Sequence, residues 1–191
     1  MLTDGAARWL LVLHVGLGVA AVGAASHFVL WSRELLRGRY GRLRAIRRFA
    51  WILLALQAGA FAAGNAMYPT YRVEVRAAYL ESREALIQQR AAHQAQLARL
   101  ARAEGADVPE AGDTGQLIRR AWAAARWFDI KEHWVALGVF GALALVLALA
   151  FWEPQTTPEL APVVFGLGAV VAATLWLGAI IGVLTASWRA I

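Results

Sequence analysis

Residues 9–31 read WLLVLHVGLGVAAVGAASHFVLW, an unbroken apolar run between two tryptophans. The run contains no charge and no proline, and at 1.5 Å per residue it is long enough to cross the roughly 30 Å hydrocarbon core of a bilayer. It contains two histidines, His14 and His27. Ionisable groups are costly in lipid, so histidines inside a predicted span are candidates for a functional role.

The composition of the whole chain agrees with a membrane protein. Of its 191 residues 60% are hydrophobic, and they gather in long blocks rather than alternating with polar residues. We therefore predict an all-α integral membrane protein of the inner membrane. The absence of cysteine excludes disulfides, thiolate metal sites, iron–sulfur clusters and thiol catalysis. The net charge of +6 comes from arginines that flank apolar spans, so we expect contact with the lipid bilayer and no nucleic acid.

Hydropathy divides the chain into two transmembrane hairpins separated by a polar insertion. The predicted architecture is a four-transmembrane-helix bundle with an extramembrane helical hairpin between spans 2 and 3. Its parts are a first hairpin, 1–68 (spans about 9–31 and 49–68, loop 32–48), the extramembrane hairpin, 69–131, and a second transmembrane hairpin, 132–191 (spans about 133–152 and 160–187).

Local signals set the ends of these elements. Pro69 is expected to end the second span, because proline cannot continue the hydrogen bonding of a helix. Leucine and aromatic residues recur every seven positions in the polar segment, at Tyr79, Leu86, His93 and Leu100, which predicts a helix with a narrow seam for one partner. A turn follows at 104–115, and Asp113 or Thr114 is expected to cap a helix that runs without proline into the third span.

The distribution of arginine predicts the orientation. Loop 32–48 carries seven arginines and one glutamate, whereas residues 1–8 are nearly neutral. The positive-inside rule therefore places this loop in the cytoplasm, and it places both termini and the 69–131 hairpin in the periplasm. Basic residues before the third span argue the other way, but long acidic segments translocate with less regard to charge.

The spacing of the histidines separates His14 from His27. Thirteen positions correspond to about 20 Å along a helix and about 220° around it, so the two side chains face different neighbours. His27 is interpreted as an interfacial imidazole bonded to a carbonyl or a headgroup. His14 is predicted to share its depth with His133, which opens the third span and stands four residues after Asp129.

Bis-histidine ligation of a b-type haem needs one imidazole from each of two helices at matched depth, and His14 with His133 supplies such a pair. The groups expected around this haem are propionate-binding cations and polar residues at the end of the second span: Arg72, Arg76, Lys131, Asn65 and Tyr68. In its layout the chain resembles small b-type cytochrome membrane subunits. It departs from their two-haem pattern in the thirteen-residue offset and in having no histidine in the second or fourth span.

Alternatives remain open at this point. The same pocket could hold a divalent metal ion through His14, His133, Asp129 and Glu132. An ordinary charged cap on a helix at the interface could equally be formed by Asp129, Lys131, Glu132 and His133, and the tyrosines and tryptophans could be belt aromatics. Gln57, in the middle of a span, is expected to bond across the bundle or to touch a quinone.

Three functional hypotheses follow from these residues. The first is a haem-binding electron-transfer subunit, which as an enzyme would be part of an oxidoreductase. The second is a cofactor-free scaffold that docks another membrane or periplasmic subunit through residues 71–128. The third is a metal-dependent membrane protein.

Overall fold

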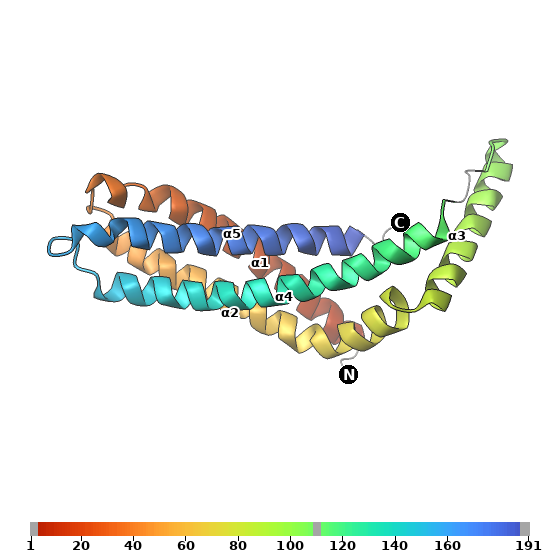
Figure 1. Cartoon of the computed structure of the whole chain (residues 1–191), viewed down its shortest axis with the longest axis horizontal. Coiled ribbons are helices and arrows are strands. Elements are labelled where there is room, and N and C mark those ends of the chain that lie inside the picture. The colour runs from red at the N-terminus through yellow and green to blue at the C-terminus, as the bar shows by residue number, and fades with distance from the viewer. Residues whose placement is uncertain (1–3, 109–111, 188–191) are drawn as a thin grey trace.

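The computed structural model describes residues 4–108 and 112–187 (Figure 1). Within them the chain is all-helical, 88% helix with no strand. The elements are α1 (Asp4–Ser32), the 3-10 turn η1 (Leu35–Arg37), α2 (Leu43–Thr70), the π-helix η2 (Tyr71–Leu80), α3 (Arg83–Glu104), α4 (Thr114–Phe151), the 3-10 turn η3 (Pro158–Leu160) and α5 (Ala161–Ser187).

Four of the described helical segments are long and apolar enough to cross a membrane, as predicted: Gly5–Arg37, Leu43–Leu80, Thr114–Phe151 and Pro158–Ala186. They suggest a multi-pass membrane protein. The helices exceed the predicted spans at several ends, and α2 begins six residues earlier than expected, inside the arginine-rich segment.

Helix α4 begins where its sequence predicts. Asp113 is the N-cap, and its carboxylate accepts hydrogen bonds from the backbone N–H groups of Gly115 and Gln116 at 2.9 and 3.1 Å. The bond from Gly115 holds the pKa of the Asp113 carboxyl below its usual value. From this cap α4 runs for 38 residues without a break, about 57 Å, which is nearly twice the thickness of a hydrocarbon core.

The prediction that the second helix stops at Pro69 is wrong. Pro69 lies inside α2, and the chain continues through Thr70 into the ten-residue π-helix η2. Proline lacks a donor and crowds the carbonyl four residues earlier, which interrupts the α pattern locally. The helix continues because the bonding pattern widens to i→i+5, the pattern that defines a π-helix.

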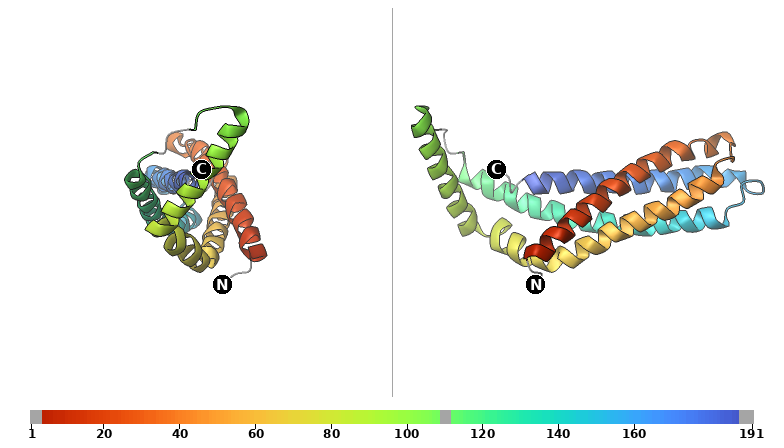
Figure 2. Two further views of the ribbon diagram at one scale, coloured as in Figure 1. Left: turned by 90° about the vertical axis from the view of Figure 1, so that its right-hand side faces the viewer. Right: turned by 180° about the vertical axis from the view of Figure 1, so that it is seen from behind.

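The four long helices form a ring. Helix α1 packs against α2 and α5, and α4 also packs against α2 and α5. Helices α1 and α4 therefore stand at opposite corners. One end of the bundle carries the connections 33–42 and 152–160 and is called the loop end. The other end, where α2 passes into η2 and α4 enters, is called the hairpin end (Figures 1 and 2).

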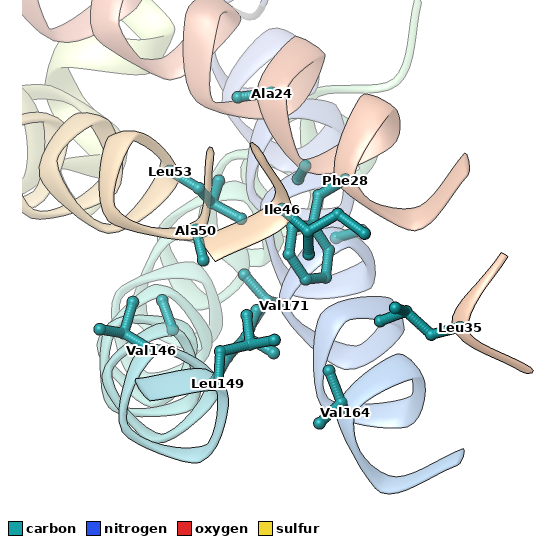
Figure 3. Packing of buried hydrophobic residues seen from close by; sticks show 14 of the residues in the cluster. Ala24, Phe28, Leu35, Ile46, Ala50, Leu53, Val146, Leu149, Val164 and Val171 are labelled. Atoms are coloured by element: carbon teal, nitrogen blue, oxygen red, sulfur yellow. The ribbon is translucent and has the colours of Figure 1, made fainter. Parts of the chain in front are cut away.

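The large apolar core fills the loop-end half. All four long helices and η1 contribute to it, and Figure 3 shows Phe28, Ile46, Leu53, Leu149 and Val171 facing one another. The ring of Phe28 lies against Gly168, where any Cβ would overlap it. Arg47 closes this end by donating to the Trp152 carbonyl at the end of α4, at 2.6 Å.

The hairpin-end half is packed differently. Its buried residues on the four long helices are mostly small or polar, with two larger apolar side chains, a leucine and an isoleucine: Gln57, Ala60, Ala63, Gly138, Thr174, Leu175, Gly178 and Ile181. The first turns of α1 lie beside the end of α2 and away from the end of α5 (Figures 1 and 2). This half therefore holds polar groups where the other half holds an apolar core.

A second small cluster joins η2, α3 and α4. Leu80 and Leu86 pack there against Ala121 and Ala125. Beyond it α3 projects past the bundle (Figure 1), and Arg90 bonds Thr114 at 2.7 Å. The predicted heptad seam is correct for Tyr79 and Leu86, which join this cluster, but wrong for its last two members. Both His93 and Leu100 are exposed because α3 has left the body of the protein by that point. The middle of the predicted turn, 109–111, lies outside the described residues.

Candidate functional site

His14 points from α1 toward α2. Its Nδ1 lies 2.7 Å from the Ala60 carbonyl oxygen, and its ring is half-buried against Gly64, where a Cβ would come within 3.2 Å of Cε1. A carbonyl only accepts hydrogen bonds, so Nδ1 carries the proton. The Nε2 atom is then left as a lone-pair donor, the arrangement typical of metal-binding histidines.

His133 on α4 has the same hydrogen-bonding pattern. Its Nδ1 lies 2.8 Å from the main-chain carbonyl oxygen of Asp129, so its Nε2 also keeps a free lone pair. The Asp129 carboxylate, which was expected to orient this ring or to join it as a ligand, is bonded elsewhere. The imidazole is exposed, unlike that of His14.

The two histidines lie on helices at opposite corners of the ring. Because α1 and α4 each pack on α2 and α5, a cofactor that binds both imidazoles would have to span the bundle. Their pairing therefore stays a prediction. The polar interior of the hairpin-end half lies between these two corners.

Arg76 links η2 to α4. Its Nη1 donates to Asp129 Oδ1 at 2.5 Å, and its Nε donates to Glu81 Oε1 at 2.8 Å. Beside this pair the rings of Tyr71 and Phe128 stack with centroids 3.9 Å apart. A propionate at Arg76 would therefore have to compete with two carboxylates, which weakens the role expected for this residue.

The other residues predicted at the pocket are brought together only in part. Asn65 is exposed and donates to the Phe61 carbonyl of its own helix. Tyr68 is half-buried, with its ring 6.4 Å from that of Tyr71. Arg72 is exposed and lines a cavity with Tyr68. The expected ring of polar groups around one pocket is therefore formed only in part.

Lys131 points into the helix interface. Its Nζ lies 5.5 Å from the centre of the Phe128 ring and 3.2 Å from the position that a Cβ of Gly182 on α5 would occupy. Across 4–108 and 112–187 no group of three or more histidine, aspartate or glutamate side chains is arranged to hold a metal ion. The four predicted ligands of a divalent metal ion, with Glu132 among them, are therefore not gathered into a site.

His27 fits its interpretation as an interfacial imidazole. Its Nδ1 lies 3.3 Å from the Gly23 carbonyl of its own helix, and its ring meets Trp31 edge to face at 6.1 Å. The side chain is exposed at the loop end, so it belongs to a different region from His14.

Gln57 does not form the interhelical hydrogen bond that was expected of it. The residue is fully buried, and neither its amide oxygen nor its nitrogen has a hydrogen-bond partner. Its nitrogen packs on Gly138 of α4 beside Thr174 of α5, whose hydroxyl donates instead to the Val171 carbonyl. Sequence reasoning overlooked Thr174, because a threonine in an apolar span carries no pattern of its own.

Comparison with known protein families, with characterised proteins and with solved structures found no significant match to this chain.

Proposed function

We propose that this chain is a membrane-embedded, b-type haem-binding electron-transfer subunit, with His14 and His133 as the axial ligands. One observation carries the proposal: each imidazole has its Nδ1 at a main-chain carbonyl, which leaves Nε2 available to iron. The chemistry supplied by the haem would be one-electron exchange with a donor such as a quinol and with a partner subunit.

The packing of the bundle supports this assignment. A porphyrin needs space between helices, and the hairpin-end half has glycines against its polar side chains in place of a large apolar core. Lys131 is the cation assigned to a propionate, because it has no carboxylate partner among the ion pairs of the described residues. The remaining protein groups would orient the haem and exclude water from it.

Haem titration of the purified protein tests the proposal. We expect the wild-type chain to bind one haemin with a low-spin, six-coordinate spectrum. His14→Ala and His133→Ala should each give a high-spin spectrum or lose the haem. His93→Ala is the matched control, because His93 is exposed on α3. The assignment is wrong if all three variants bind haem as the wild type does.

The orientation and the membrane form a second part of the proposal. We infer an inner-membrane protein with the arginine-rich loop end in the cytoplasm and the hairpin end in the periplasm. Because the chain has no cysteine, single cysteines can be introduced cleanly at exposed positions such as Gln96 on α3 and Arg37 in η1. A membrane-impermeant maleimide should label Gln96→Cys in intact spheroplasts and leave Arg37→Cys unlabelled, and the reverse result would invert the topology.

A second candidate function is docking of a partner protein by the projecting hairpin. The observation that favours it is the exposure of large apolar side chains on a segment beyond the predicted spans: Ile87, Leu100, Val108 and Trp122. This role predicts that deletion of residues 72–126 abolishes recovery of a partner from solubilised membranes. Alanine at His14 or His133 would leave that recovery unchanged.

A further inference from the structure

A cavity of about 420 Å³ opens where α2 passes into η2. It is lined by Tyr68, Arg72, Arg76, Ala77 and Glu81. The junction lies at the end of the apolar run of α2, beside Pro69, and is marked by a tyrosine of the kind that bilayer interfaces favour. In a membrane this is the depth of phospholipid headgroups.

The charges that line this cavity differ in how they are held. Arg76 is fixed by Glu81 and Asp129, so its position is set before any ligand arrives. The Arg72 guanidinium forms no ion pair and no hydrogen bond within the described residues, and it is exposed. Glu81 uses Oε1 for Arg76, which leaves Oε2 to accept from a ligand. Two guanidiniums and two carboxylates make the site neutral overall.

We propose that this cavity binds the headgroup of a zwitterionic phospholipid with a primary ammonium, of the phosphatidylethanolamine type. The lipid phosphate accepts hydrogen bonds from the Arg72 guanidinium and the Tyr68 hydroxyl, since arginine suits phosphate geometry. The ammonium donates to Oε2 of Glu81. A quaternary ammonium has no N–H to donate, and an anionic lipid would leave Glu81 facing negative charge, so the site discriminates against both.

Competition binding with the full-length protein in detergent micelles tests the proposal. The probe is a phosphatidylethanolamine with a fluorescent acyl chain, displaced by unlabelled phosphatidylethanolamine, phosphatidylcholine, phosphatidylglycerol or inorganic phosphate. We expect phosphatidylethanolamine to compete about tenfold better than phosphatidylcholine, the effect of one charge-assisted hydrogen bond. Inorganic phosphate should not displace the probe.

Two variants locate the binding groups. Arg72→Gln should weaken the binding of both zwitterionic lipids about tenfold. The substitution leaves the fold intact, because the Arg72 guanidinium has no hydrogen-bond or ion-pair partner to lose within the described residues. Glu81→Gln should lower the affinity for phosphatidylethanolamine to that for phosphatidylcholine, and the affinity for phosphatidylcholine should not change. Arg99→Gln, at an exposed arginine of α3, is the matched control and should match the wild type.

The proposal is overturned if phosphatidylglycerol competes best, if the Arg72 variant binds like the control, or if inorganic phosphate displaces the probe. The last result would show that the cavity takes a free phosphate rather than a lipid.

Discussion

Gly138→Ala is the substitution with the most direct consequence in the bundle. A Cβ at position 138 would lie 2.5 Å from Gln57 Nε2, 2.6 Å from Thr174 Oγ1 and 3.2 Å from Thr174 Cβ. These separations are shorter than van der Waals contact, and the threonine is held by its bond to Val171. Overpacking of this kind costs about 1–3 kcal/mol. Because the end of Gln57 is flexible and Thr174 is not, we expect the threonine contact to account for most of the loss.

The assay is unfolding of the purified protein by denaturant in mixed micelles. Gly16→Ala is the matched control, because a Cβ there meets nothing within 4 Å. It should be neutral or stabilising by up to about 1 kcal/mol through helix propensity. Adding Gln57→Ala to Gly138→Ala should restore part of the lost free energy of unfolding. The coupling free energy between the two substitutions measures how much of that loss comes from the contact with the Gln57 amide. The reasoning is refuted if Gly138→Ala is as stable as Gly16→Ala.

Three further perturbations follow from single contacts. Arg47→Met should lower the free energy of unfolding by about 1.5–3 kcal/mol, because the Trp152 carbonyl loses a charged donor at 2.6 Å; an unchanged midpoint would rule this bond out as a stabilising contact. A double-mutant cycle of Arg76→Gln and Asp129→Asn should give a coupling free energy of about 0.5–1 kcal/mol, which is modest because both side chains are partly exposed. A coupling free energy of zero would mean that this ion pair is not formed in micelles. The depressed pKa of Asp113 means that its cap is fully present above the pKa of Asp113 in the unfolded chain and is lost as the pH falls through the lower folded value. The protection factors of the amides in the first turn of α4, corrected for the slower intrinsic exchange in acid, should therefore fall with acid in the wild type but not in Asp113→Asn.

The apolar spans and the continuity of α4 could be predicted from sequence. Hydropathy over a window of bilayer length identifies a span whatever its neighbours are. The absence of proline between Gln116 and Phe151, together with the carboxylate of Asp113, predicts a single long helix with a capped start. These signals depend only on neighbouring residues in the sequence, and α4 has the predicted start and continuity in the structure.

The order of the helices around the ring could not be predicted. In a membrane the lipid-facing and core-facing residues are both apolar, so periodicity does not reveal which helices touch. The sequence therefore suggested His14 and His133 as a pair without indicating that α1 and α4 stand at opposite corners. The π-helix could not be predicted from the sequence either. Its wider turn brings Arg76 to Glu81, five positions away.

The side-chain partners of the polar residues could not be predicted from the sequence either. Asp129 and His133 are four apart on a helix, which favours a contact between carboxylate and imidazole. The carboxylate is bonded instead to Arg76, which is distant in sequence, and the imidazole uses the main-chain carbonyl. A contact expected from spacing along one helix is therefore lost when a residue from another element offers a competing partner.

Haem binding by His14 and His133 is decided by the visible spectrum of the protein as purified from membranes, oxidised and then reduced with dithionite. We expect a Soret band and, on reduction, the sharp α-band of a low-spin b-type haem, both lost in the double variant of His14 and His133. A wild-type preparation that has no Soret band and takes up no added haemin would contradict haem binding.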